Sequence, residues 1–482
     1  MSEVQTYKVK LGPAKCAVDL GDGSERGPYV NQDYILHKLG RPHRAINLMF
    51  CYYPLDSGWP LRASLAHANE NISFQWDFPY DDYFPYTGGL NGSKDGDVFQ
   101  YMKDVRRHGQ DVLLTMTIDP HVTDEHLIAI AKDLTTYGRV LFRINHEATG
   151  NWFSFTKRCT YQEVADFYVR FHKIIKEYAP NVQTILCTGG VERNGSGEIE
   201  KEAEFKEAVK TTDIWSIDQY LALHWGWPYD VAEAGGSSHK RYVVSEVFDY
   251  ARKSYERFKY INAGVAKPMV MSELNADGDV TGPYDQAAMM KEFADLVQSE
   301  PEQWFSAFTM YQFRDNGRLG LEITDPNQFE AGIEQPLMQT YKRIIHSDFF
   351  KPTMIVEKAT TLPVTLRWGG AEDSEGISIP LQFQGSPIFC EAYFENELKD
   401  ANFMMELNGH WFYKAPGVKC IDFMEVFYKQ PISHACILNL NIFAPPATGE
   451  NDPSQGTDWQ INYYTTLTSL PNIRIRYQPI EK

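Results

Sequence analysis

The sequence predicts an α/β protein in which a (β/α)8 TIM barrel is followed by an all-β sandwich domain. Three observations lead to this prediction. The chain has 482 residues, which is long for one domain. From residue 44 to about 350, apolar strand-like runs alternate with helical stripes, as in a barrel of parallel strands. In residues 351–482 short strand-like runs are broken by Gly, Pro, Asn and Asp, which is typical of a β-sandwich.

The N-terminal segment, residues 1–43, precedes the predicted barrel. It contains one strand candidate, residues 7–11, then a Gly-rich turn and a polar stretch. We expect it to lead into the barrel or to pair with the last domain. Residues 1–10 carry neither a basic leader nor an apolar run. We therefore expect a cytoplasmic protein, or a secreted one from which a signal peptide has been removed.

Eight apolar or β-branched runs predict the strands of the barrel, residues 44–350. They are residues 45–50, 72–76, 112–118, 140–144, 182–187, 214–217, 268–271 and 305–311. Helical stripes between them are predicted at residues 98–107, 123–135, 161–178, 242–258, 284–298 and 336–346. In such a barrel the loops that follow the strands build the site.

The clearest of these helices is predicted at residues 161–178. Thr160 followed by Glu163 is the pattern of a capping box, and Pro180 ends the helix. Apolar residues between them recur three and four positions apart, which predicts one face directed at the core.

The last segment, residues 351–482, is predicted to form the strands of the sandwich. The strand candidates are residues 354–356, 364–368, 377–383, 388–394, 403–407, 437–443 and 473–477, and residues 444–457 are predicted to be a long loop. The aromatic residues of this domain fit either a carbohydrate-binding surface or a structural contact with the barrel; they are Trp368, Trp411, Tyr413 and Trp459.

Polar residues after the fourth predicted strand carry the strongest chemical signal. Arg143, His146, Glu147 and Trp152 follow a strand that is apolar on both faces. Glu147 should therefore emerge at the C-terminal edge of a buried parallel sheet, where α/β enzymes keep their sites. Taken alone, the pattern also fits a loop glutamate satisfied by Arg143.

A second carboxyl group, Glu273, follows the seventh predicted strand. Acids at the top of strands four and seven face each other across the mouth of a closed barrel. Two facing carboxyl groups are what cleavage of a glycosidic bond requires, since one protonates the leaving oxygen and the other attacks or activates water. The pair Glu147 and Glu273 is therefore the predicted catalytic centre.

Further polar and aromatic residues are predicted around this pair. Tyr220 follows the sixth strand and is expected to donate a hydrogen bond to Glu273, which favours its ionised form. Trp152, Trp225 and Trp227 lie on loops after strands four and six. These indoles fit stacking on sugar rings, and Trp225 and Trp227 equally fit covering the rim of the barrel.

These motifs resemble those of glycoside hydrolase family 26, the β-mannanase family of the large retaining (β/α)8 clan. Arg143, His146, Glu147, Trp152 and their neighbours resemble the acid/base motif of that family. Residues 213–220 and 267–273 resemble its strand-six and nucleophile motifs, and together the three motifs cover about residues 44–347. The resemblance implies a retaining mechanism.

In that mechanism Glu147 is the general acid and then the base, and Glu273 is the nucleophile. The resemblance also implies that His146 contacts the sugar beside the cleaved bond and that Arg143 sets the local charge. The two carboxyl groups are then expected to lie about 5–5.5 Å apart, with a raised pKa at Glu147.

The composition favours a neutral partner. The net charge of -18 argues against nucleic acid and against an anionic membrane, and an aromatic content of 14% suits a glycan. We expect an oligo- or polysaccharide substrate, no cofactor and no metal. Two alternatives stay open: a barrel that binds glycans without cleaving them, with a carbohydrate-binding sandwich, and a metal-dependent hydrolase. The sequence does not indicate the oligomeric state.

Overall fold

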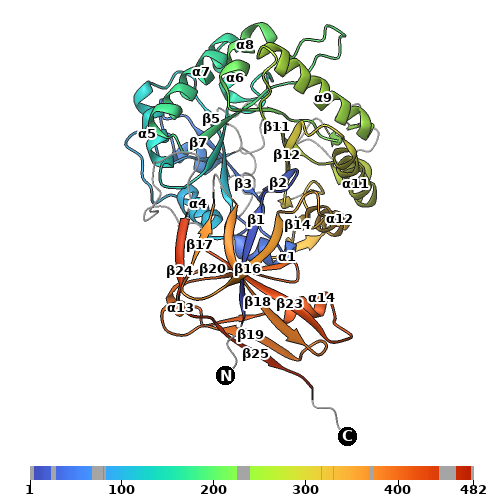
Figure 1. Cartoon of the computed structure of the whole chain (residues 1–482). Helices are drawn as coiled ribbons and strands as arrows, with labels where there is room; N and C mark the ends of the chain where they lie inside the picture. The colour runs from blue at the N-terminus through green and yellow to red at the C-terminus, as the bar shows by residue number, and fades with distance from the viewer. Residues whose placement is uncertain are drawn as a thin grey trace.

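The computed structural model shows a barrel ringed by helices, stacked on a pair of β-sheets (Figure 1). It describes residues 5–22, 29–67, 80, 83–224, 239–315, 317–328, 330–369, 373–444 and 463–478. The strand candidate 72–76 and all but the first residue of the predicted loop 444–457 lie outside these residues. Among the helices described, none is long and apolar enough to cross a membrane.

The barrel is a closed ring of parallel strands. Pairing runs in the order β2-β12-β11-β8-β7-β6-β5-β3, and β2 also pairs with β3, which closes a ring of eight. The strands are β2 (Ala17–Gly21), β3 (Ala45–Tyr52), β5 (Asp111–Ile118), β6 (Val140–Ile144), β7 (Val182–Cys187), β8 (Ile214–Ile217), β11 (Met269–Leu274) and β12 (Phe305–Met310). The predicted TIM barrel is thus confirmed.

Helices surround this ring and bury their apolar faces against it in one continuous core. They are α1 (Gln32–Leu39), α4 (Asp97–Arg107), α5 (Asp124–Leu134), α7 (Tyr161–Tyr178), α8 (Glu202–Thr211), α9 (Val244–Ile261), α11 (Pro283–Ser299) and α12 (Pro336–Ile345). The helix predicted at 161–178 is confirmed together with its capping box at Thr160 and Glu163.

Shorter elements lie in the loops of the barrel. They are α2 (Leu61–His67), β4 (Phe84–Pro85), α6 (Ser154–Arg158), β9 (Ala222–His224), β10 (His239–Arg241), α10 (Gly278–Thr281), β13 (Arg314–Asp315), β14 (Glu322–Thr324) and β15 (Gly332–Glu334).

The first strand of the ring comes from the segment that we expected to precede the barrel. Strand β2 was not predicted because Asp19 interrupts its apolar run. In the structure Asp19 is buried and accepts a hydrogen bond from Nε of Arg44 at 2.9 Å. The ring therefore takes its first strand from residues 1–43, and the candidate at 45–50, predicted as the first strand, becomes the second. Strands β6, β8 and β11 keep the predicted places of four, six and seven.

The C-terminal strands form two sheets that enclose a second core. The larger sheet contains β1 (Thr6–Gly12), β16 (Thr353–Thr360), β17 (Val364–Trp368), β18 (Ser374–Phe383), β20 (Phe403–Leu407), β21 (His410–Lys414), β23 (Cys436–Phe443) and β24 (Tyr463–Leu467). The smaller sheet contains β19 (Phe389–Tyr393), β22 (Cys420–Asp422) and β25 (Asn472–Arg476), and two short helices, α13 (Glu397–Asp400) and α14 (Met424–Lys429), complete the domain. The predicted sandwich is confirmed, with β1 as a strand contributed by the N-terminal segment.

The larger sheet packs against the N-terminal ends of the barrel strands. The backbone N–H of Trp411 donates to the carbonyl of Gly40 at 2.8 Å, and the rings of Tyr413 and His108 lie 4.5 Å apart between centroids. Trp368 and Trp411 belong to an apolar cluster shared with Leu36 of α1. The sandwich therefore covers the end of the barrel opposite to the loops that follow the strands.

Candidate active site

A turn in left-handed conformation follows β6 and carries the first acid. Asn145 has φ 46° and Glu147 has φ 49°, a region that non-glycine residues rarely adopt. The side chain of Asn145 holds the turn in place, since it accepts from the N–H of Ile118 at 2.6 Å and donates to the carbonyl of Ile118 at 3.2 Å. The turn is thereby fixed to the end of β5.

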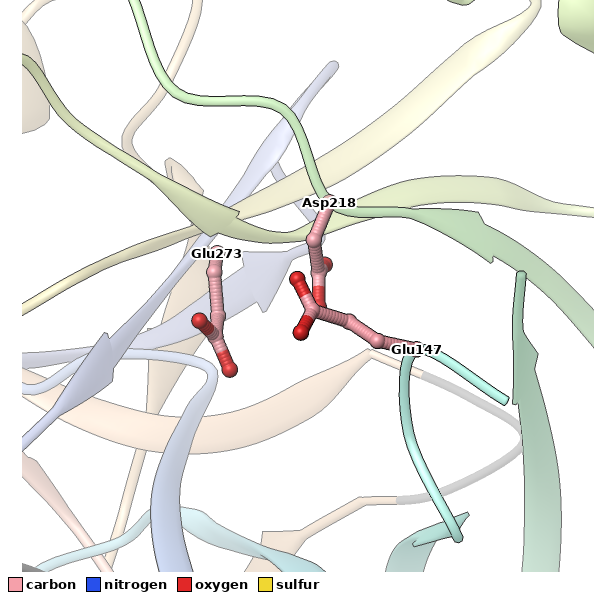
Figure 2. A group of neighbouring side chains, drawn as sticks. All are labelled: Glu147, Asp218 and Glu273. Atoms are coloured by element: carbon pink, nitrogen blue, oxygen red, sulfur yellow. The ribbon is translucent and has the colours of Figure 1, made fainter. Parts of the chain in front are cut away.

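Three carboxyl groups converge at the C-terminal end of the barrel (Figure 2). Glu147 follows β6, Asp218 follows β8 and Glu273 lies in β11. One carboxylate oxygen from each lies within 4.8 Å of one from each of the others. The predicted meeting of Glu147 and Glu273 is therefore present, and Asp218 is a third acid that was not predicted. Its signal was the same, because it too follows a strand end, two positions before Tyr220.

One guanidinium group connects two of these carboxylates. Arg143 is fully buried and donates to Asp218 at 3.0 Å and to Glu273 at 2.9 Å, while its Nε donates to Oγ1 of Thr115 at 2.8 Å. A single cation thus faces three acids. Like charges at this separation disfavour one another, so at least one of the three acids tends to hold its proton.

The pKa values of two of these acids are raised. Burial is the main cause for Glu147, whose pKa lies well above its ordinary value, and the charges of Glu273 and Asp218 raise it further. Burial also raises the pKa of Asp218 to about 7, against the opposing charge of Arg143. Burial and the neighbouring carboxylates therefore favour the protonated form of Glu147.

Glu273 is surrounded by donors. The hydroxyl of Tyr220 donates to its Oε2 at 2.6 Å, as expected from the sequence, and Arg143 donates to its Oε1. Nε2 of His146 lies 3.7 Å from the same Oε1. Burial and the neighbouring Arg143 lower the pKa of His146 well below its ordinary value, so this imidazole is neutral. The arrangement stabilises negative charge on Glu273.

Trp152 lies against the first acid instead of standing free in the mouth. Its indole N–H donates to Oε2 of Glu147 at 2.9 Å. A Cβ at Gly150 would lie 2.4 Å from the indole, so glycine at this position lets the ring pass close to the backbone. Of the predicted site residues, Trp225 and Trp227 lie outside the described residues, and the other six are all brought together here.

The same three carboxylates are also the type of ligand that a hard divalent cation prefers. Arg143 and Tyr220 already donate to two of them, Asp218 and Glu273, so a cation would compete with a buried guanidinium for the same oxygens. The donor set fits general acid and nucleophile chemistry more directly, and a chelator distinguishes the two uses.

The comparisons with known proteins give similarity of fold. No protein-family model and no curated protein matches the sequence. The chain is similar to a family 26 β-mannanase from Bacteroides ovatus, with 12% identity, 70% of this chain and 90% of that chain covered, and a TM-score of 0.42. It is also similar to a modular endo-β-1,4-mannanase from Cellulomonas fimi, with 10% identity, 94% of each chain covered and a TM-score of 0.42.

A third similar structure is a family 51 α-L-arabinofuranosidase from Bifidobacterium longum, with 9% identity, 90% of this chain and 98% of that chain covered, and a TM-score of 0.45.

Proposed function

We propose that this protein is a retaining glycoside hydrolase that cleaves a β-linked glycan by double displacement. The observation that carries the proposal is the separation of Glu147 and Glu273, whose nearest carboxylate oxygens lie within 4.8 Å. Retaining enzymes place their two carboxyl groups about 5–5.5 Å apart, and inverting enzymes need about 6.5–9.5 Å to admit a water molecule.

The two acids differ in the way that the two roles require. Glu147 has a raised pKa and so holds the proton that a general acid must give to the glycosidic oxygen. Glu273 accepts hydrogen bonds from Arg143 and Tyr220, which suits a carboxylate that attacks the anomeric carbon. In the first step the C–O bond breaks, the leaving oxygen takes the proton of Glu147, and Glu273 forms a glycosyl ester.

The second step reverses these roles. Once Glu273 is an ester its negative charge is gone, so the pKa of Glu147 falls and its carboxylate can take a proton from water. The resulting hydroxide attacks the anomeric carbon, the ester bond breaks, and Glu273 returns as a carboxylate. The sugar leaves with the configuration that it had in the substrate.

The residues around the pair support these steps by position. Arg143 orients Glu273 and Asp218, Tyr220 fixes Oε2 of Glu273, and Trp152 fixes Glu147. We assign to the neutral His146 the contact with the sugar beside the cleaved bond that the family 26 resemblance implies; its Nε2 lies 3.7 Å from Oε1 of Glu273.

The substrate that we propose first is β-mannan, followed by related β-glucan, xylan or oligosaccharides. The resemblance of residues 143–153 and 267–273 to family 26 motifs favours mannan. The net charge of -18 favours a neutral polymer over an acidic one. A glycan-binding barrel without activity is the alternative, and it gives no account of the close pair of acids.

A hydrolysis screen of the purified chain tests the proposal. The substrates are mannan, glucomannan, xylan, mixed-linkage glucan and galactan, and the readouts are product length and the anomer released first. Release of β-anomers that persists in EDTA is the expected result. Release of α-anomers would contradict retention, activity lost on chelation would favour the metal-dependent hydrolase, and binding without hydrolysis would favour the non-catalytic barrel.

A further inference from the structure

A groove of about 900 Å³ lies on the flank of the barrel, between the loop after β7 and helix α9. It does not include the three carboxylates. Its lining includes Val191, Arg193, Tyr242, Tyr250, Arg257 and Tyr260. A volume of this size accommodates several sugar rings, since ligand pockets are typically about 300–1,000 Å³.

The floor of the groove is held by hydrogen bonds between the loop and the helix. The N–H of Gly190 donates to the hydroxyl of Tyr250 at 2.8 Å, and the N–H of Val191 donates to Oγ of Ser254 at 3.1 Å. Arg257 donates to Glu202 through two nitrogens, at 2.8 and 2.6 Å. The groove is thus formed before any ligand enters it.

The charges of the groove favour a neutral ligand. Three of its cations are paired with carboxylates: Arg252 with Glu300, Lys253 with Asp249, and Arg257 with Glu202. Arg193 instead contacts the neutral side chain of Gln219 at 3.2 Å. An anionic ligand would have to displace these pairs, whereas a ligand with many hydroxyl groups can use Arg193 as a donor and the carboxylates as acceptors.

Aromatic rings supply the apolar surface that such a ligand needs. The guanidinium of Arg193 lies 4.9 Å from the ring centroid of Tyr242 and 5.5 Å from that of Tyr250. Tyr260 also lines the groove and is 72% exposed. Tyrosine rings combine a face that packs on the C–H surface of a sugar with a hydroxyl that binds its polar edge.

A run of hydrogen bonds connects the lining of the groove to the carboxylate pair. Gln219, which accepts from Arg193, precedes Tyr220, and its Nε2 donates to the carbonyl of Tyr220 at 2.9 Å. Tyr220 in turn donates to Glu273. We propose that the groove binds the distal part of a neutral oligosaccharide chain that extends from the carboxylate pair. This inference rests on the proposed glycosidase function.

Binding measurements on the full chain test the groove independently of catalysis. Mannohexaose, cellohexaose and xylohexaose are titrated by calorimetry into Glu273→Gln, and into the same protein carrying Arg193→Ala and Tyr260→Ala. We expect the added substitutions to weaken binding of at least one hexasaccharide by about tenfold, the effect of losing roughly 1–1.5 kcal/mol of ring and hydrogen-bond contact. Tyr284→Ala is the matched control, because Tyr284 is a 79% exposed tyrosine on a different helix, α11.

Kinetics on long and short substrates give a second readout. In the protein with an intact Glu273, Tyr260→Ala should lower kcat/KM for the polysaccharide several-fold and leave the 4-nitrophenyl monoglycoside of the same sugar unchanged. This variant keeps the contact between Arg193 and Gln219, so an effect transmitted through Tyr220 is excluded. Equal hexasaccharide affinity in all variants would contradict the proposal that the groove binds the oligosaccharide. If nothing is hydrolysed, the proposed activity fails, and the calorimetry alone decides the groove.

Discussion

Two charged clusters, one at each end of the barrel, have opposite ratios of acidic to basic side chains. At the C-terminal end, three carboxyl groups, Glu147, Asp218 and Glu273, converge around the single guanidinium of Arg143. At the N-terminal end, beneath the sandwich, the single carboxylate of Asp111 meets two guanidinium groups, those of Arg106 at 2.8 Å and Arg139 at 2.9 Å. In the first cluster the carboxyl groups outnumber the guanidinium group, and in the second the guanidinium groups outnumber the carboxylate.

Under the proposed function, this difference separates a cluster suited to reaction from a contact suited to stability. Burial, and then the charges of Glu273 and Asp218, raise the pKa of Glu147, which suits the general acid of the proposed mechanism. Around Asp111 the buried carboxylate is fully compensated, and Arg106 also donates to the hydroxyl of Tyr463 in the sandwich at 3.0 Å. The first arrangement is expected to respond to pH and to substrate, and the second to neither.

The largest expected effect comes from removing the acids of the reactive end. Glu147→Ala and Glu273→Ala should each lower turnover on polysaccharide by several orders of magnitude, roughly 10⁴-fold or more, because each removes a group that acts in the transition state. Thermal unfolding should show that both variants remain folded.

The leaving group then separates the two roles. A 2,4-dinitrophenyl glycoside needs little protonation of its leaving oxygen, so Glu147→Ala should retain much of its first-step rate on this substrate. Glu273→Ala should remain inactive on it, because the nucleophile is still missing. Near-wild-type activity of either variant on polysaccharide would contradict the assignment of both carboxyl groups.

Removing the sandwich should affect stability and not substrate affinity. Truncation after residue 350 would expose the apolar face of β1 and α1 that carries Val9 and Leu36, so we expect an insoluble product. Trp411→Ala is the milder version. Trp411 is buried in the contact with the barrel, so its loss should lower the free energy of unfolding by about 3 kcal/mol.

Urea unfolding and polysaccharide binding check this prediction together. A lower unfolding midpoint with unchanged affinity is expected for Trp411→Ala. A soluble, active truncated barrel that has lost affinity for polysaccharide would instead make the sandwich a carbohydrate-binding module.

A matched pair of Asp→Asn substitutions compares the two ends directly. Asp111→Asn leaves two guanidinium groups facing a neutral amide and should lower the free energy of unfolding by about 3 kcal/mol at pH 5 and at pH 8 alike. Asp218→Asn should behave differently with pH. The pKa of Asp218 is raised in the folded protein from 3.8 to about 7. Its contribution to stability is therefore full below pH 3.8 and is lost as the pH rises through about 7.

The free energy of unfolding of the wild-type protein should thus fall between pH 4 and pH 8 through the ionisation of Asp218. This contribution to the fall should be absent from Asp218→Asn. The difference between the two should grow in favour of the variant by an amount on the order of a few kcal/mol. Urea unfolding midpoints at the two ends of this range measure it. A constant difference across the range would mean that Asp218 is ionised throughout.

The same contrast explains which features could be predicted from sequence. At the C-terminal end of the barrel, isolated polar residues follow apolar strands. Glu147, Glu273 and Tyr220 could therefore be predicted from their positions in the sequence. Asp218 follows a strand end in the same way, but its place in the sequence does not show that it shares Arg143 with Glu273, because both residues are distant in the chain.

The first strand of the barrel, β2, was not predicted for a related reason. An aspartate within an apolar run indicates a loop unless a buried partner for it is known. Asp19 is paired with Arg44 through the closure of the ring, which the sequence does not show. The role of Trp368 and Trp411 could not be decided for the same reason, since aromatic residues that bind sugar and aromatic residues that pack between domains have the same sequence pattern.

The smallest expected effect is a shift in the pH dependence of activity, and it tests the interaction between Glu147 and Asp218. The general acid must be protonated, so kcat/KM should fall as the pH rises through the raised pKa of Glu147. Because the charge of Asp218 helps to raise that pKa, Asp218→Asn should move the alkaline limb of the profile to lower pH. Asp285→Asn is the control, since Asp285 pairs with Arg241 at the surface and should leave the limb in place.

The shape of that limb carries further information. Asp218 loses its proton at about pH 7, and its new charge makes the loss of the next proton from Glu147 harder. The wild-type limb should therefore extend over a wider pH range than the titration of one group, whereas Asp218→Asn should follow a single ionisation. The contrary result is a wild-type limb that is as steep as one ionisation and does not move on Asp218→Asn. It would mean that Asp218 carries the same charge across the whole pH range. Only Glu147 and Glu273 would then take part in the pH dependence.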